Sequence, residues 1–145
     1  PRGSGTGAAV QATLDTLPIG KGEILQKGTR AAILAYGSMV EICRPVATAM
    51  DLTLIDMKFI KPLDEALVLE MAATHRLLVT VEENAIAGGA GSAVAEYLAE
   101  QQQTVDLVHL GLPDAFLDHA SPKEMLSSVG LDAAGIQHSI AARLG

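Results

Sequence analysis

A glycine-rich turn joins two apolar segments within residues 77–98. The run at 77–81 is rich in β-branched residues, and Gly88, Gly89 and Gly91 follow it. A strand, a turn and a helix are therefore expected, which together form half of a βαβ unit. Backbone N–H groups at such a helix start can bind phosphate. The spacing matches neither G-x-G-x-x-G nor a P-loop, so close packing of the helix on the strand is the favoured interpretation.

Two adjacent carboxylates, Glu82 and Glu83, lie between the apolar run and the glycines. Neighbouring residues on an extended strand point to opposite faces, so these two side chains cannot act together as a catalytic acid and base. We expect one of them to be buried with a partner and the other to be in solvent.

The other residues that could carry chemistry are scattered. The four histidines show no i,i+4 helical pair and no cysteine partner, so no metal site is predicted. Cys43 stands in a helical pattern without an activating neighbour, and no G-x-S-x-G sequence is present. His119, in a predicted loop, is the one histidine that we single out for testing. Arg2 offers a planar fork suited to phosphate, although alone it is a weak signal.

Apolar runs alternate with helical periodicities, and this alternation predicts the elements that position these residues. Strands are expected at 22–26, 31–36, 52–56, 77–84 and 105–110, the first of them a short edge strand. Helices are expected at 39–50, 62–76, 92–103, 121–130 and 132–144. The alternation favours an α/β fold, in which helices cover a mostly parallel sheet through right-handed crossovers.

The second predicted helix has the clearest end signals. Pro62 suits its first turn, Asp64 and Glu65 suit its positive end, and His75 and Arg76 suit its negative end. We therefore expect Pro62 inside the helix.

Polar residues follow several predicted strands at their carboxyl ends, which gather on one rim of an open α/β sheet. Ligands and partners bind at such rims, so we expect any interface of this chain there. Ordinary caps and turns are the alternative interpretation of the same residues. The residues in question are Asp56, Lys58, Glu82, Glu83, Asn84, Asp114 and His119, with Ser38 after the second strand.

The composition excludes several classes of protein. The 145 residues carry a net charge of −7, and only 3% of them are aromatic, which argues against nucleic acid as a partner. Uncharged apolar runs are no longer than a strand and no signal-peptide pattern is present, so no membrane association is predicted. A single cysteine fits a reducing compartment, and a cytoplasmic location is expected.

The chain divides into a lead-in and one domain. Residues 1–22 are rich in glycine and show little periodicity, which predicts an irregular linker from an upstream domain. Residues 23–145 are expected to form one domain. The sequence begins Pro1-Arg2-Gly3 without methionine, so we expect it to belong to a longer protein.

Five segments together resemble the C-terminal domain of the 1-deoxy-D-xylulose-5-phosphate synthases, a family of transketolase-like enzymes. They are PRG at 1–3, LPIGKG at 17–22, DMKFIKPLD at 56–64, VTVEENAIAGGAGS at 79–92 and GLPD at 111–114. The resemblance extends over essentially the whole chain. It implies a three-layer α/β/α domain with a five-stranded, mostly parallel sheet whose first strand is antiparallel and lies at or near the edge.

The resemblance also implies a function for the parent enzyme. Members of this family condense pyruvate with D-glyceraldehyde 3-phosphate and release CO₂, and they use thiamine diphosphate and Mg²⁺ in isoprenoid and thiamine biosynthesis. They are homodimers, in which upstream domains of the same chain make the cofactor contacts and this domain supports the architecture. Arg2 aligns with an arginine that contacts the substrate phosphate. The chain lacks the Gly-Asp-Gly motif for metal and diphosphate, so we expect neither cofactor binding nor catalysis by these residues alone.

Three other functions are open alternatives. The chain could be a dimerisation module without a ligand, which exposed apolar helix faces would support. It could be an anion-binding regulatory module that uses the rim and the turn at 88–92. It could also be the closing domain of a 2-oxoacid dehydrogenase β subunit, although the Glu82-Glu83-Asn84 sequence argues against this.

Overall fold

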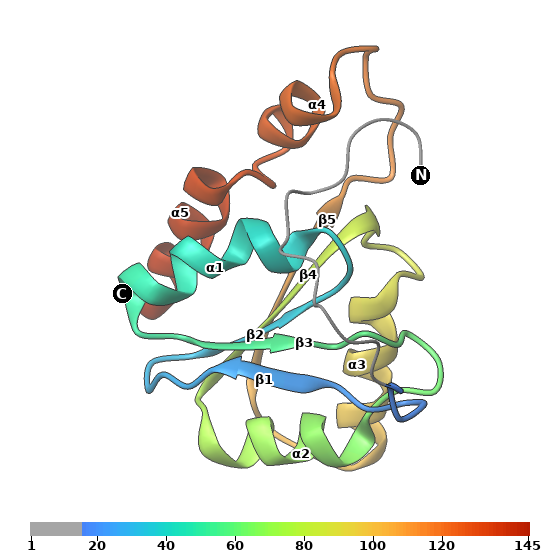
Figure 1. The fold of residues 1–145 in the computed structure, drawn as a ribbon, viewed down its shortest axis with the longest axis vertical. Helices are drawn as coiled ribbons and strands as arrows, with labels where there is room; N and C mark the ends of the chain where they lie inside the picture. The colour runs from blue at the N-terminus through green and yellow to red at the C-terminus, as the bar shows by residue number, and fades with distance from the viewer. Residues whose placement is uncertain (1–15) are drawn as a thin grey trace.

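A five-stranded sheet forms the centre of the molecule (Figure 1). The structure is a computed structural model that describes residues 16–145. Along the chain the elements are β1 (Glu23–Gln26), β2 (Ala32–Ala35), α1 (Met39–Met50), β3 (Thr53–Asp56), α2 (Glu65–Thr74), β4 (Leu77–Ala85), α3 (Ala90–Glu100), β5 (Asp106–Leu112), α4 (Pro122–Ser128) and α5 (Ala133–Leu144).

The strand order is β1-β3-β2-β4-β5. The first strand, β1, pairs antiparallel with β3 at one edge, and the other neighbouring strands are parallel. The predicted fold, a mostly parallel sheet with an antiparallel first strand at the edge, is therefore confirmed.

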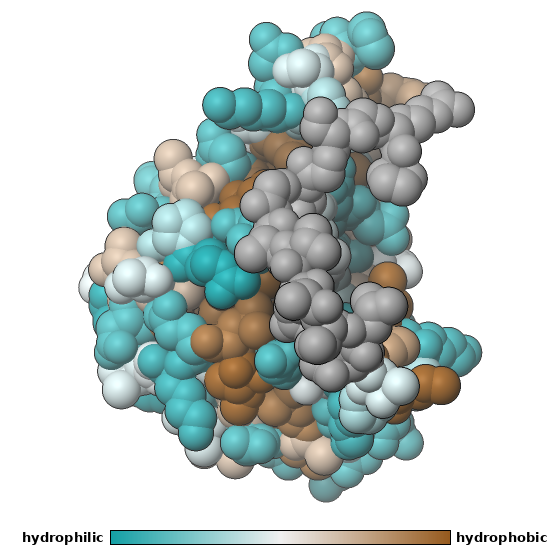
Figure 2. Space-filling view, in the orientation of Figure 1, coloured by the Kyte–Doolittle hydropathy of each residue, from teal (hydrophilic) through white to brown (hydrophobic). Residues whose placement is uncertain are grey.

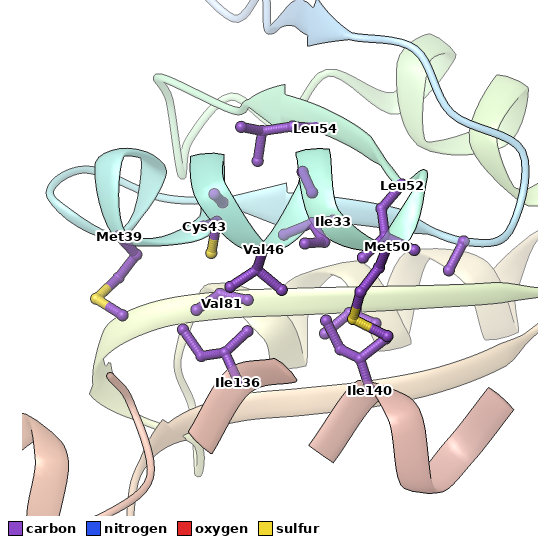
Figure 3. Packing of buried hydrophobic residues seen from close by; sticks show 14 of the residues in the cluster. Ile33, Met39, Cys43, Val46, Met50, Leu52, Leu54, Val81, Ile136 and Ile140 are labelled. Atoms are coloured by element: carbon purple, nitrogen blue, oxygen red, sulfur yellow. The ribbon is translucent and has the colours of Figure 1, made fainter. Parts of the chain in front are cut away.

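Helices cover both faces of this sheet. One face packs against α1 and α5, and the other packs against α2 and α3 (Figure 1). On the first face, Ile136 of α5 points toward Val81 of β4, and Ile140 points toward Met50 of α1 (Figure 3). Both isoleucines are fully buried, and burial of each stabilises the fold by about 1.5–3 kcal/mol. The first six residues of β4 are buried, as expected for an inner parallel strand covered on both faces.

The predicted start of α2 is wrong by three residues. The helix begins at Glu65, and Asp64 caps it by accepting the N–H of Leu67 at 3.3 Å. Pro62 lies before the cap because an aspartate that accepts a helix N–H must itself stay outside the helix. At the other end, His75 is the C-cap and Arg76 follows it, so neither residue is part of the last turn.

The start of α3 also differs from the prediction. This helix covers Ala90–Glu100 rather than 92–103, and Gly89 is its N-cap. The glycine turn is shorter than expected because its last two residues already belong to the helix.

The starts of the last two helices are confirmed. Ser121 and Glu124 form a capping box at α4, with Pro122 at the first helical position. Asp132 caps α5 by accepting the N–H of Gly135 at 2.8 Å.

The surface in the view of Figure 2 is mostly hydrophilic, but hydrophobic residues reach it over β1 and β3. Ile24 and Leu25 of β1 are half-buried. No helix within residues 16–145 has both the length and the apolar character needed to cross a membrane.

Candidate functional site at the carboxyl ends of the strands

The carboxylate of Glu82 caps the N-terminus of α3. Its two oxygens accept the N–H groups of Ala90 and Gly91, each at 2.7 Å. The side chain is 3% exposed. A negative group at the N-terminus of a helix satisfies unpaired N–H groups and interacts favourably with the helix dipole. One of the two adjacent glutamates was expected to be buried with a partner. That glutamate is Glu82, and its partners are the N–H groups at the start of α3.

The glycines of the turn allow this close approach. A Cβ on Gly91 would lie 2.5 Å from Thr80 Oγ1 and 2.5 Å from His109 Nδ1, and a Cβ on Gly89 would collide with the Glu82 carboxylate. Close packing of helix on strand, the favoured interpretation of these glycines, is therefore confirmed. The N–H groups that could have bound a phosphate here are taken by Glu82.

Three further polar residues lie near Glu82 and were not singled out from the sequence. Thr80 Oγ1 and His109 Nδ1 are 2.8 Å apart. Within residues 16–145, the buried Tyr36 hydroxyl has no hydrogen-bond partner. We call Tyr36, Thr80, Glu82 and the half-buried His109 the polar cluster beneath α3. One feature of the sequence could have indicated this cluster. Thr80 and Glu82 are two residues apart on a strand, so both side chains lie on the same face of β4, the face that α3 covers.

Burial governs the ionisation of this cluster. It raises the pKa of the Tyr36 hydroxyl, and the nearby negative charge of Glu82 raises it further. Burial lowers the pKa of His109, and Glu82 partly opposes that effect. Both shifts favour the neutral form of the group concerned.

Glu83 has the opposite environment. It is exposed, and its Oε2 accepts the Ser38 hydroxyl at 2.6 Å. Ser38 follows β2, which leads into α1 on one face, whereas β4 leads into α3 on the other face. Connections that diverge from neighbouring strands leave a crevice at their carboxyl ends, which is where open α/β sheets bind ligands. Ser38 and Glu83 lie at this position.

Asp56 and Lys58 also lie on the rim, but they serve the end of β3. The Asp56 carboxylate accepts the N–H of Lys58 at 3.0 Å. The Lys58 ammonium lies 2.5 Å from a carboxylate oxygen of Glu23, at the start of β1. These contacts join the two strands at their ends, so both side chains have local structural roles.

A groove of about 540 Å³ starts beside the rim and runs along α3, between this helix and the segment that leads into α2. Its lining includes Asn84, which is exposed, and the carboxylates of Glu65, Glu96 and Glu100. Burial, followed by the charges of Glu65 and Glu100, raises the pKa of Tyr97 in the same groove. The groove is therefore acidic.

Asp64 is a second buried carboxylate. From the sequence it was expected only to lie near the start of a helix. Besides capping α2, it accepts the N–H of Gly22 at 3.0 Å and the Lys21 ammonium at 3.1 Å. Burial would raise the pKa of Asp64, but these donors outweigh burial and lower it. The contacts hold the segment before β1 against the start of α2.

The remaining predicted site residues are not part of this arrangement. Asp114 and His119 are exposed in the loop after β5, and no hydrogen bond within residues 16–145 joins either side chain to the rest of the rim. Arg2 lies outside the described residues. No group of three or more His, Cys, Asp or Glu side chains in the described part could hold a metal ion. Burial raises the pKa of the Cys43 thiol to about 12.

The fold and the polar strand ends define a class of protein. A model of the transketolase C-terminal domain matches residues 20–136. The chain belongs to this family.

Individual relatives narrow the class further. The chain is 59% identical over 141 residues to 1-deoxy-D-xylulose-5-phosphate synthase of Alkalilimnicola ehrlichii, a match that covers 97% of this chain and 22% of that enzyme. The synthases of Thioalkalivibrio sulfidiphilus and Pseudomonas entomophila are 56% and 53% identical, and each match covers 99% of this chain. The predicted resemblance to the C-terminal domain of these synthases is confirmed. The chain spans 22% to 23% of the length of these three relatives.

Solved structures agree with the fold. A split-gene transketolase, described as an inactive β4 tetramer, has a TM-score of 0.81 at 31% identity, covering 88% of this chain and 43% of that one. A 2-oxoglutarate:ferredoxin oxidoreductase from Magnetococcus marinus has a TM-score of 0.55 at 12% identity, covering 86% of this chain and 19% of that one. This second likeness concerns the fold alone.

Proposed function

We propose that this chain acts as the C-terminal domain of a 1-deoxy-D-xylulose-5-phosphate synthase. Such an enzyme would condense pyruvate with D-glyceraldehyde 3-phosphate and release CO₂. The observation that carries the proposal is the 59% identity to one such synthase across 97% of this chain. The named relatives give no support to the alternative of a 2-oxoacid dehydrogenase β subunit.

The proposed role of this domain is architectural rather than catalytic. The one turn where the sequence suggested a phosphate cradle does not fit a diphosphate, because the N–H groups of Ala90 and Gly91 are donated to Glu82. A diphosphate there would also meet the negative charge of that carboxylate. We therefore assign thiamine diphosphate and Mg²⁺ to the rest of the enzyme, and no catalytic step to this chain. The same contacts disfavour an anion-binding regulatory module at this turn.

A contribution to a homodimer is part of the proposal. The split-gene transketolase relative is described as a tetramer of its β chain. Hydrophobic residues reach the surface of the present chain over β1 and β3 (Figure 2), and Leu25 there is only half-buried. Apolar surface of this kind supports association, because burial of such area is favourable.

Arg2 remains the proposed contact to the substrate phosphate. Its role rests on the family resemblance. In the intact enzyme we expect Arg2→Ala to raise the KM for D-glyceraldehyde 3-phosphate about ten-fold and to affect kcat less, because a contact to a remote phosphate is mostly binding energy. An unchanged KM would exclude this role.

A chimeric enzyme tests the main proposal. The matching region of the Alkalilimnicola ehrlichii synthase is replaced by this chain, and synthase activity is measured beside the natural enzyme and beside a truncated enzyme without the region. We expect the chimera to keep activity within about five-fold of the natural enzyme and the truncated form to lose it. A chimera that unfolds cooperatively but has no activity would overturn the proposal.

A second assay tests the architectural role. The purified chain is incubated with pyruvate, thiamine diphosphate and Mg²⁺, and release of CO₂ is followed. We expect no release above the protein-free control. Measurable decarboxylation would assign catalysis to these residues.

A further inference from the structure

Glu83 is an exposed carboxylate whose hydrogen-bond partner among residues 16–145 is a hydroxyl group. Its oxygen accepts the Ser38 hydroxyl at 2.6 Å across the crevice between β2 and β4. None of the ion pairs found within residues 16–145 involves Glu83. A carboxylate has room for further hydrogen bonds beyond one hydroxyl, and a guanidinium or ammonium group is its strongest partner.

The crevice around Glu83 is open. A Cβ added to Gly37, next to Ser38, would meet no atom of residues 16–145 within 4 Å. On the other side, Asn84 lines the acidic groove of about 540 Å³. Exposed apolar side chains also lie in this region, because Ile60 lines the groove and is 56% exposed, and Ile86 follows β4 and is 36% exposed. A carboxylate that is flanked by exposed apolar side chains and by a groove is typical of a surface that binds a partner.

The polypeptide enters the domain at this same rim. Because β1 is antiparallel to β3, its first residue pairs with the last residue of β3, Glu23 with Asp56. The segment before β1 is fixed there, since the N–H of Gly22 and the ammonium of Lys21 are both donated to Asp64. Any polypeptide that precedes this domain is therefore delivered to the carboxyl ends of the strands.

We propose that this rim is the surface on which the catalytic part of the synthase docks, and that Glu83 accepts a basic side chain from it. The inference rests on the proposed function, under which the remaining three quarters or more of the enzyme would precede this domain, since the chain spans 22% of the relative's length. Three observations point to this occupant: the open crevice, a carboxylate without an ion pair among residues 16–145, and the entry of the chain at the rim.

A second copy of the same rim fits less well. In a two-fold symmetric contact the same patch faces itself. This patch carries the carboxylates of Glu65, Glu83, Glu96 and Glu100 against the ammonium of Lys61, while the Lys58 ammonium on the rim is paired with Glu23, so two copies would repel each other. A basic surface on the catalytic part would instead be attracted.

Cysteine footprinting of the chimera tests the docking surface. Ile86→Cys and Ile60→Cys are reporters on the rim. Ala73→Cys is the control, because Ala73 is exposed at the end of α2 that leads into the amino end of β4, away from the rim. Alkylation of each cysteine is followed by peptide mass spectrometry in the native and urea-unfolded enzyme. We expect at least one rim cysteine to react about ten-fold more slowly in the native enzyme, after correction for its unfolded rate, than the control.

The charge of Glu83 is tested separately in the same chimera. Glu83→Gln keeps an oxygen that can accept the Ser38 hydroxyl but removes the charge, and Glu70→Gln removes an exposed charge from α2. We expect Glu83→Gln to restore reactivity of the rim cysteines about five-fold and Glu70→Gln to leave it unchanged. Equal effects of the two changes would overturn the assigned role of Glu83.

The outcomes separate this inference from the proposed function. An inactive chimera would contradict the proposed function before any reporter is read. An active chimera whose rim cysteines react as fast as the control would overturn the docking surface alone. Protection that disappears when the dimer is diluted to monomers would assign the rim to a second copy and would also overturn it.

Discussion

Glu82 and Glu83 are neighbours of the same type, yet they occupy opposite environments. Glu82 is 3% exposed and accepts two helix N–H groups, whereas Glu83 is exposed and accepts one hydroxyl. The Glu82 carboxylate uses both of its oxygens in hydrogen bonds within the domain, whereas the Glu83 carboxylate can accept further hydrogen bonds. The contrast separates a buried group that stabilises the fold from a rim group that is available to a partner.

Removal of the Glu82 charge should have the largest effect on stability. In Glu82→Gln an amide NH₂ would face one of the two buried N–H groups of Ala90 and Gly91, which leaves that donor unsatisfied. We expect the free energy of unfolding to fall by about 3 kcal/mol in urea titrations of the purified chain. A loss no larger than that of Glu83→Gln would erase the contrast between the two residues.

Gly91→Ala should have the next largest effect. The new methyl group would lie 2.5 Å from Thr80 Oγ1 and from His109 Nδ1, so α3 or the side chains must move. We expect a loss of about 2 kcal/mol, measured in the same titrations. Ala95→Gly, elsewhere on α3, serves as a control that tests helix propensity alone and should lose about 1 kcal/mol. Wild-type stability of Gly91→Ala would show that the turn is not tightly packed.

Asp64→Asn tests the second buried carboxylate and its dependence on pH. Asparagine can still cap α2, but it loses the charge toward Lys21 and one of two acceptor oxygens, so we expect a loss of about 1 kcal/mol at pH 7. The pKa of Asp64 is lowered in the folded state. The carboxylate therefore stabilises the fold above its unfolded pKa, and this contribution is lost as pH falls below about 4.

The measurement for Asp64 is the difference in unfolding free energy between wild type and Asp64→Asn at several pH values. This difference should shrink between pH 5 and pH 2.5. A difference that stays constant over that range would contradict the lowered pKa.

Glu83→Gln should have the smallest effect on the purified chain. The residue is exposed, and its oxygen acceptor for Ser38 is retained. We expect the free energy of unfolding to change by less than about 0.5 kcal/mol. Combined with an effect on the rim reporters of the chimera, this result would sharpen the assignment of Glu83 to recognition. A large loss of stability would instead place Glu83 with Glu82.

The sequence by itself determined the layers of the domain and most of its elements. Apolar runs of strand length alternate with helical periodicity, and such a pattern can bury its apolar side chains only in a sheet covered by helices on both faces. Ser121 and Asp132 also located two helix starts, because their cap hydrogen bonds join residues only three apart. The opposite orientation of Glu82 and Glu83 follows in the same way from the strand period of two.

Only the tertiary structure decided which glutamate is buried. The strand period of two places the two glutamates on opposite faces but does not say which face is covered. The buried residue is Glu82 because α3 packs against its face of β4. The pairing of β4 with β5 also shifts between Val81 and Ala85, an irregularity that no local pattern announces. Tyr36 follows β2, Thr80 lies in β4 and His109 lies in β5, so their meeting around the helix start depends on the order of those strands in the sheet. Asp114 and His119 were expected on the rim, but the long loop after β5 leaves both without a contact to it.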